Sequence, residues 1–368
     1  MRSDRVPTSN AGFIKMKVRS FLSIISAVVL AAFANVAFAI IVAPTTTNNT
    51  QPTSTTNSQP SSSPGLATGL ISVTGLGNAS LVGGAVSSFA SGGNNQVGLD
   101  VKRFALSGKT GAAAAPGDKM WNVWGAYSRS NIAYNFAPLQ SSGNVNVYLA
   151  GVDYTFANNM VLGVAVAADR TDVDLNFSGG KLKGSGVTVS PYLGIAINKN
   201  MAFDATLGFG RTNIDTTVGT TTGSTRSDRS VGSLGLTYRE VIGAWSLSGR
   251  GAFLAVSDKL GAYTLTNGTF IPDGTVNVSQ IRLTGQAAYT SGPVTPYVSL
   301  TYINDIRRPD QAPVGGFAAA NDRDAWTPAI GLRFRADNSV YGGIQYSTER
   351  GRSEVKNNQF LFNLGIRF

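Results

Sequence analysis

The sequence predicts an all-β protein, a 12-stranded antiparallel transmembrane β-barrel formed by residues 120–368 and preceded by a mostly disordered N-terminal segment. From Met120 onward, apolar and polar residues alternate with period two over segments of about ten residues or more, which is the pattern of membrane-spanning strands. Charged residues make up only 14% of the chain, against roughly 25% in an average soluble domain. After residue 40 there is still no run of about 18 apolar residues, the length that a membrane-spanning helix needs.

The first 39 residues have the pattern of a secretory signal peptide. Lys15, Lys17 and Arg19 precede an apolar stretch that ends in Ala37-Phe38-Ala39. Small residues at Ala37 and Ala39 predict cleavage after Ala39. An uncleaved membrane anchor is the alternative interpretation, and the initiator is either Met1 or Met16.

Residues 40–119 divide into two parts by composition. Residues 40–64 are rich in Thr, Asn, Ser and Pro and carry no charge or aromatic residue, so we expect a low-complexity disordered linker. Residues 65–119 are richer in Gly and Ala and form either a short passenger or a further linker. Ala79–Ala90 could form a short helix, which Gly83 and Gly84 would weaken.

Twelve alternating segments follow, and the connections between them alternate in length. The predicted strands are 120–134, 144–156, 160–174, 184–197, 201–214, 228–241, 244–257, 275–290, 294–306, 323–336, 339–349 and 359–368. Tight turns are expected at 157–159, 198–200, 243, 291–293 and 337–338, and longer polar loops at 135–143, 175–183, 215–227, 258–274, 307–322 and 350–357. Short periplasmic turns and long external loops are typical of bacterial outer-membrane barrels, whose even strand number places both ends in the periplasm. A soluble β-sandwich would explain only the alternation of polarity.

The alternation assigns side chains to the two faces of the barrel wall. Aromatic residues near strand ends are predicted to form interfacial girdles, namely Trp121, Tyr154, Phe156, Trp245, Tyr289, Tyr302 and Trp326. The inward set includes basic residues, namely Arg239, Arg250, Arg282, Arg333, Arg335 and Arg367. With Asp204 and Glu240 among the few counter-charges, a polar and net basic lumen is expected. These arginines either fill the lumen as structural ion pairs or bind anions and guide a passenger.

The composition excludes several classes of chemistry. The chain has no His and no Cys, so triads and metal sites that need imidazole or thiolate ligands are absent. We therefore expect no catalytic residues, no metal site and no cofactor, although carboxylate-only hydrolysis is a minor alternative. Part of the net charge of +10 lies in the first 39 residues, and no basic cluster with interleaved aromatic residues predicts nucleic-acid binding.

Two short motifs invite functional interpretations that their surroundings do not favour. Ser107-Gly108-Lys109-Thr110 ends like a phosphate-binding loop, but Arg103 occupies the position where that motif needs Gly. Asn94-Asn95 could cleave by asparagine cyclisation, but a turn is the better interpretation.

Taken together, these features resemble the C-terminal translocator domain of the autotransporter family. The resemblance covers roughly residues 115–368 and is carried by the signal peptide, the linker, the twelve strands, the stretch Trp121-Asn122-Val123-Trp124-Gly125 and the final Ile366-Arg367-Phe368. It implies that a helix or extended linker threads the barrel, a role open to residues 65–119. The ending also resembles the signal that the outer-membrane assembly machinery recognises, carried here by Phe360, Phe362, Leu364, Ile366 and Phe368. The chain departs from the family because the part between Ala39 and Met120 shows no β-helix repeats and no catalytic set.

The leading hypothesis is an autotransporter-type barrel in the outer membrane of a Gram-negative bacterium, which anchors or translocates a short N-terminal segment to the cell surface. A small porin-like channel with a basic lumen is the first alternative. A surface adhesin that acts through external loops such as Gly261–Gly274 and Arg307–Asp322 is another. The expected partners are outer-membrane lipid, lipopolysaccharide, the assembly machinery and periplasmic chaperones, with a monomer as the expected state.

Overall fold

A computed structural model describes residues 120–136, 140–156, 159–176, 178–290, 292–308, 320, 322–336 and 340–368. The expectations for the signal peptide, the linker and the Gly/Ala-rich segment concern residues 1–119 and lie outside the described residues. Within the described ranges, no helix is long and apolar enough to span a membrane.

The described chain forms long antiparallel strands and one short hairpin. The barrel strands are β1 (Trp121–Tyr134), β2 (Ser141–Thr155), β3 (Met160–Leu175), β4 (Gly180–Ala196), β5 (Met201–Val218), β6 (Thr221–Ile242), β7 (Trp245–Leu260), β10 (Gly274–Tyr289), β11 (Val294–Arg307), β12 (Asp324–Ala336), β13 (Val340–Glu349) and β14 (Val355–Arg367). The hairpin β8 (Tyr263–Thr264) and β9 (Phe270–Ile271) lies in the connection between β7 and β10.

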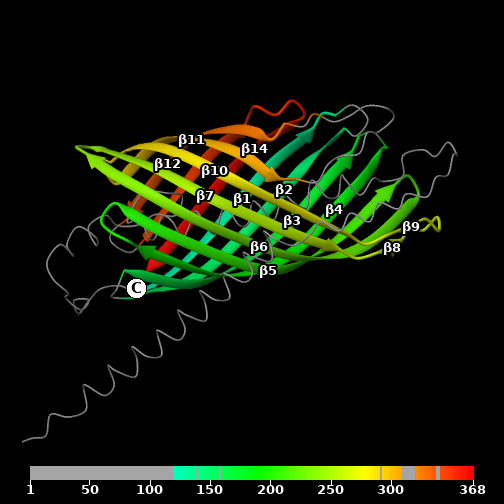
Figure 1. Cartoon of the computed structure of the whole chain (residues 1–368), viewed down its shortest axis with the longest axis horizontal. Helices are drawn as coiled ribbons and strands as arrows, with labels where there is room; N and C mark the ends of the chain where they lie inside the picture. Colours follow the sequence, from blue (N-terminus) through cyan, green and yellow to red (C-terminus); the bar gives the residue numbers. More distant parts are fainter. Residues whose placement is uncertain are drawn as a thin grey trace, which may run out of the picture. The chain divides into compact units, whose positions relative to one another are not determined.

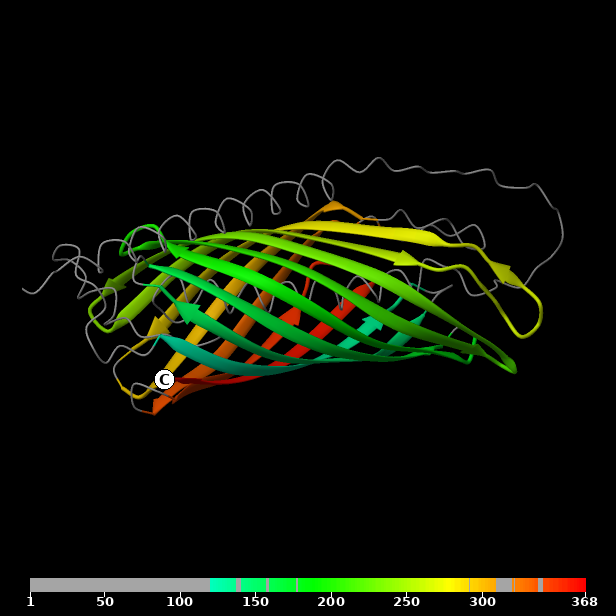
Figure 2. The ribbon, with the colours of Figure 1, turned by 90° about the horizontal axis from the view of Figure 1, so that it is seen from below.

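The twelve long strands close into a barrel in which each strand pairs with its neighbours in the chain, and β14 pairs with β1 (Figure 1). The predicted fold class and strand number are confirmed. At the seam, the backbone nitrogens of Trp121 and Phe368 donate to each other's carbonyl oxygens at 3.1 and 3.0 Å. Closure leaves no open edge along the seam, as a strand in lipid requires. The C-terminus and the β8–β9 hairpin lie at opposite ends of the barrel (Figures 1 and 2).

Several connections differ from the prediction because the strands are longer than expected. The predicted loop at 215–227 is instead the tip of a hairpin, in which β5 and β6 stay paired up to Val218 and Thr221 and turn at Gly219 with φ of 59°. The predicted loop at 175–183 likewise shrinks to the residues between Leu175 and Gly180. Residues 215–227 are rich in Thr, a good strand former, and in both places the strands continue beyond the residues at which the sequence interpretation ended them. Long connections remain at 261–273 and 308–323.

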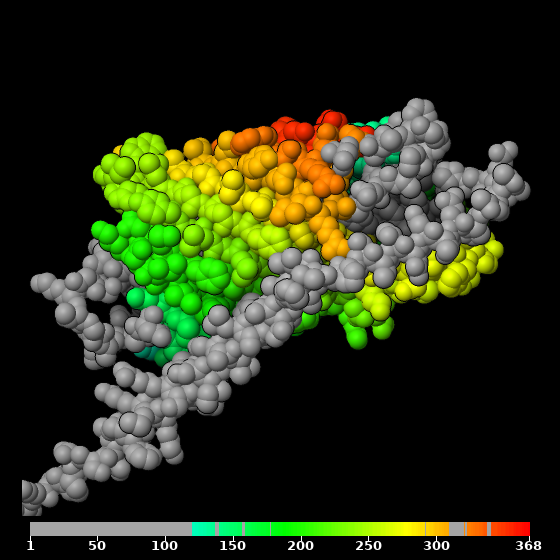
Figure 3. All heavy atoms as spheres, in the orientation of Figure 1, coloured from blue at the N-terminus to red at the C-terminus, as the bar shows by residue number. Residues whose placement is uncertain are grey.

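The outer wall carries a band of exposed apolar side chains. Neighbouring strands form one continuous surface in the space-filling view (Figure 3). Examples of exposed side chains on this band are Val123, Val152, Val164, Val189, Phe209, Leu236, Leu247, Leu283, Val298, Leu300, Ile330, Leu332, Ile344, Phe362 and Leu364. So many exposed apolar groups on one surface suit lipid contact and not water.

Candidate functional site

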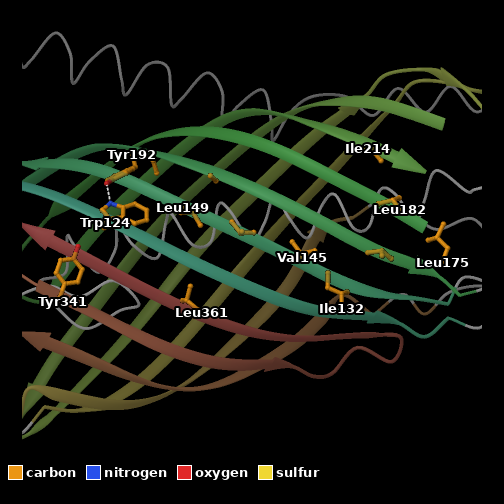
Figure 4. Close-up of a cluster of buried hydrophobic side chains, with 14 of the residues drawn as sticks. Trp124, Ile132, Val145, Leu149, Leu175, Leu182, Tyr192, Ile214, Tyr341 and Leu361 are labelled. Atoms are coloured by element: carbon orange, nitrogen blue, oxygen red, sulfur yellow. Dashed lines mark hydrogen bonds between the residues drawn. The ribbon is translucent and has the colours of Figure 1, made fainter. Parts of the chain in front are cut away.

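The inner wall of the barrel is the surface on which a function of this fold depends, and two parts of it are apolar. Its larger apolar cluster comes mainly from the inward register of β1–β5 (Figure 4) and includes Trp124, Ile132, Val145, Val147, Leu149, Val161, Ala165, Ala167, Val173, Leu175, Leu182, Tyr192 and Ile214, with Tyr341 and Leu361. A smaller cluster on β6, β7 and β10 consists of Val231, Ala252, Leu254, Val256, Val276 and Val278. The prediction of a polar, net basic lumen did not include these apolar clusters. Period-two alternation identifies two faces, but in these strands both faces carry apolar residues, so polarity alone did not show which was inside.

At the short-turn end, a hydrogen-bonded network crosses the inner wall next to the seam. Trp124 Nε1 donates to the hydroxyl of Tyr192 at 2.9 Å, and that hydroxyl donates to Asp153 Oδ2 at 2.7 Å. Asn122 Nδ2 donates to the same oxygen at 3.0 Å and accepts at Oδ1 from the Tyr341 hydroxyl at 2.8 Å. The network links β13 on one side of the β1–β14 seam to β1, β2 and β4 on the other side, so it joins the two ends of the barrel wall.

A second polar cluster lies deeper in the barrel and was missed by the sequence interpretation. Arg229 on β6 donates from Nη1 to Asp169 on β3 at 3.1 Å and from Nε to Asp258 on β7 at 3.0 Å. All three side chains are at most 1% exposed, and Ser227 also donates to Asp258 at 3.3 Å. The signal was present in the sequence, because Arg229 lies on the same face of the strand as Arg239, ten residues further on.

The six predicted luminal arginines all lie on the inward register, and several have defined partners. Arg250 Nη2 is 2.6 Å from Asp204 Oδ2, with Asp204 fully buried. Arg333 stacks on the Tyr297 ring at 3.9 Å from its centroid and donates to Gln286 Oε1 at 2.8 Å.

The other four arginines lie on β6, β10, β12 and β14. Arg367 lies 4.8 Å above the Tyr341 ring, and Arg239 donates to Ser246 Oγ at 2.8 Å. Arg282 donates to Gln280 Oε1 at 2.8 and 3.0 Å, whereas Arg335 is exposed near the end of β12.

Glu240 is not a luminal counter-charge, contrary to the prediction. It is exposed on the outer face, where its Oε2 accepts from the hydroxyl of Tyr238 at 2.7 Å and from Asn200 Nδ2 at 2.8 Å. Arg239 is buried, and a strand places consecutive residues on opposite faces, so the two cannot both point inward.

At the long-loop end, Asp305 joins strands and loops. Gln280 Nε2 donates to Asp305 Oδ1 at 2.6 Å, and Arg352 Nη2 is 2.9 Å from Asp305 Oδ2. Beyond it, Asp322 Oδ2 accepts from the backbone nitrogen of Ser353 at 2.7 Å. The Ser353 hydrogen bonds, helped by Arg308 and Arg352, lower the pKa of the Asp322 carboxyl below its usual value, against a smaller opposing effect of desolvation.

The predicted girdle residues contact one another in small groups on the outer wall. Trp121 packs against Tyr154, and Tyr154 against Phe156, with ring centroids 5.0 and 4.8 Å apart; Trp245 packs against Tyr289 at 5.2 Å. These residues lie at the short-turn end of their strands. Tyr302 and Trp326, with centroids 5.0 Å apart, lie toward the long-loop end. The two groups bracket the apolar band.

The remaining predicted residues concern targeting. Phe360, Phe362, Leu364, Ile366 and Phe368 are all exposed on the outer face of the last strand and its end. Ala37 and Ala39 lie outside the described residues. Within the described ranges there is no group of three or more acidic side chains placed to hold a metal ion.

The comparisons agree with this architecture. Residues 123–347 match the family described as the autotransporter beta-domain. The fold is similar to the translocator domain of the autotransporter NalP from Neisseria meningitidis, with a TM-score of 0.59 and 12% identity over 73% of this chain and 93% of that one. It is also similar to the β domain of the Bordetella autotransporter BrkA, with a TM-score of 0.57 and 14% identity over 68% of this chain and 100% of that one. No curated protein matches the sequence. Because the family match spans most of the chain, the protein belongs to the autotransporter β-domain family of Gram-negative outer-membrane barrels.

Proposed function

We propose that this barrel anchors the N-terminal segment, displays it at the cell surface, and holds residues 65–119 in its lumen as the connecting chain. The observation that carries the proposal is the position of β1. It begins at Trp121, at the end of the barrel where the turns are short and where the C-terminus lies. In outer-membrane barrels this end faces the periplasm. A preceding segment that reaches the surface must therefore pass through the lumen.

The length of the Gly/Ala-rich segment is sufficient for that path. The hydrocarbon core is about 30 Å thick, which an extended chain crosses in about ten residues and a helix in about twenty. Residues 65–119 exceed both requirements.

The inner wall offers two kinds of surface to such a segment. The apolar cluster of β1–β5 can cover Ala, Leu and Val side chains, while β6–β12 offer arginines beside a smaller apolar cluster. We assign the luminal arginines a structural role first, because Arg229 and Arg250 are committed to buried carboxylates. The proposal includes no catalytic step.

Insertion of such a barrel into the outer membrane requires several partners. Periplasmic chaperones would carry the unfolded strands, the assembly machinery would recognise the terminal strand, and lipid with lipopolysaccharide would surround the apolar band. We propose a monomer, because the barrel closes on itself without a second chain.

The test uses the absence of native cysteine. A single Ser61→Cys variant should react with a membrane-impermeant maleimide in intact cells as fast as a Thr220→Cys control at the tip of the β5–β6 hairpin. Asn200→Cys, in a short turn, should react only after the outer membrane is permeabilised. Protection of Ser61→Cys in intact cells would contradict display.

A channel is the second candidate, favoured by the arginines that line β10–β12. If residues 65–119 leave the lumen open, planar bilayers should show anion-selective conductance that falls in an Arg333→Gln and Arg335→Gln double variant. A barrel filled by its own segment should conduct little until that segment is deleted.

A further inference from the structure

The outer wall of β1–β3 carries a short row of three polar side chains at the edge of its apolar band that is nearer the long-loop end. Arg129 on β1 pairs in register with Asn146 on β2, which pairs with Arg170 on β3. All three belong to the outward register, and both arginines are exposed. Adjacent strands lie about 4.8 Å apart, so the two guanidinium groups flank Asn146 within reach of a single ligand between them.

The row presents hydrogen-bond donors to its surroundings. The hydroxyl of Tyr127 donates to Asn146 Oδ1 at 2.9 Å. Tyr127 is also in the outward register of β1, so the amide oxygen is engaged within the outer wall and the Nδ2 group is available as a donor to a ligand. A guanidinium on each side and an amide in the middle form a constellation suited to an anion with several acceptor oxygens.

Other cations on the same outer surface are neutralised by acidic neighbours. Lys181 lies 3.2 Å from Asp174, and Arg211 lies 2.8 Å from Asp228. Among the described residues, no ion pair joins Arg129 or Arg170 to a carboxylate, and the register continues to Ser185 without an acid. The nearest outward acid on the same strand is Asp172, which pairs in register with Lys183. The row is therefore a local concentration of positive charge.

The surface directly below the row is aromatic and aliphatic. The rings of Tyr127 and Tyr148 lie 5.1 Å apart, and Tyr148 is half exposed. Exposed aliphatic residues continue down the same strands as Val152, Val164 and Val166. A ligand held by the row would have apolar surface for long chains immediately beneath its charged group.

We propose that Arg129, Asn146 and Arg170 bind a phosphate group of a lipid A molecule, the phosphorylated glycolipid anchor of lipopolysaccharide, whose acyl chains lie on the apolar band of β1–β3. The assignment to the outer leaflet rests on the orientation in the proposed function, in which the long-loop end faces outward. Phosphate supplies the acceptor oxygens and negative charge that match two guanidinium groups and an amide.

Binding can be measured on the full-length protein, folded in detergent with a chelator present, by titration with diphosphoryl lipid A and native mass spectrometry. The wild type should bind this lipid at least about tenfold more tightly than enzymatically dephosphorylated lipid A, since charge-assisted hydrogen bonds are lost. Arg129→Gln combined with Arg170→Gln should remove that preference. Asn146→Asp, which keeps an acceptor for Tyr127 but adds a negative charge, should also remove it.

Arg211→Gln is the matched control, because Arg211 is an exposed outward arginine that is already paired with Asp228. The Arg211→Gln variant should bind lipid A with the same affinity as the wild type. Folding of every variant is checked by the heat-dependent shift in gel mobility. Equal binding of phosphorylated and dephosphorylated lipid, or equal losses in Arg211→Gln and the double variant, would overturn the proposal. Equal binding of phosphatidylglycerol, or full competition by inorganic phosphate at matched concentration, would overturn the assignment to lipid A.

The result is separable from the test of display. If Thr220→Cys reacts only from the periplasm, the orientation is wrong and the proposed function fails with it. If Thr220→Cys reacts from outside and lipid A binding does not depend on Arg129 and Arg170, only the lipid site fails.

Discussion

At the scale of single residues, glycines on the inner wall leave room for the aromatic rings of neighbouring strands. A Cβ at Gly151 would overlap the indole of Trp124, and a Cβ at Gly163 would overlap the ring of Tyr192. The missing side chains let these rings lie flat on the wall, where Trp124 donates to Tyr192. These glycines therefore have a packing role that the alternation of polarity alone does not reveal.

Gly163→Ala should lower the free energy of unfolding by about 1–3 kcal/mol, because the added methyl group forces the Tyr192 ring out of its position. Denaturant unfolding of the refolded barrel would measure it. Gly285→Ala is the matched control, since a Cβ there has open space around it on the outer face. A similar loss of unfolding free energy in both variants would show that the effect comes from the backbone freedom of glycine and not from displacement of the Tyr192 ring.

Arg229→Met should destabilise the barrel by about 3–5 kcal/mol, because it leaves the buried carboxylates of Asp169 and Asp258 facing each other without their cation. Arg211→Gln removes an ion pair whose side chains are 73% and 65% exposed and should cost less than about 1 kcal/mol. The same unfolding assay compares the two variants. An Arg229→Met barrel as stable as Arg211→Gln would contradict the structural role of the triad.

At the scale of elements, the last strand has two neighbours and two faces. It pairs with β1 and β13, and its outward residues from Phe360 to Phe368 face the lipid side. Its inward Leu361 is 3% exposed and belongs to the apolar cluster of the inner wall. Leu361, an apolar residue between the polar inward positions Gln359 and Asn363, thus has its own packing site.

Deletion of Phe368 should lower the amount of folded barrel in the outer membrane while export to the periplasm stays intact. The deletion removes the exposed terminal aromatic side chain and the backbone pair with Trp121. Fractionation and heat-dependent gel mobility would measure the two pools. Phe368→Tyr is the control that keeps the aromatic ring and the pair. Normal surface levels of the truncated chain would contradict the assembly role.

The connection between β11 and β12 is fastened to the one between β13 and β14 by Asp322 and Ser353. A carboxyl with a lowered folded-state pKa contributes stability above its unfolded-state pKa and loses that contribution as the pH falls through the folded value. Proteolysis of this connection should therefore accelerate below the usual range of aspartate titration. An Asp322→Asn variant should be susceptible already at neutral pH and show little pH dependence. Equal pH profiles for both proteins would contradict the role of this carboxyl.

At the scale of the whole molecule, the sequence predicted the closed barrel, its strand number and the short turns, because each depends on period-two alternation and turn residues near in sequence. It did not predict the buried triad of Arg229, Asp169 and Asp258, whose members come from β6, β3 and β7 and meet only after closure. The apolar inner wall was missed for a related reason. Its residues face the lumen, whereas the usual pattern of barrel strands predicts apolar residues on the outer face and polar residues facing a water-filled interior.

The central claim is that the segment before β1 passes through the lumen along the apolar wall of β1–β5. Ala167 and Ala168 offer a matched pair for testing it, because they are neighbours at the same height, with Ala167 buried on the inner face and Ala168 exposed on the outer face. A cysteine placed in turn at each residue of Ala112–Ala115 can be combined with a cysteine at either position in a chain that has none of its own. After oxidation in intact membranes, at least one combination with Ala167→Cys should form an intramolecular disulfide, and none with Ala168→Cys should. Disulfides with neither position, or equally with both, would contradict passage through the lumen.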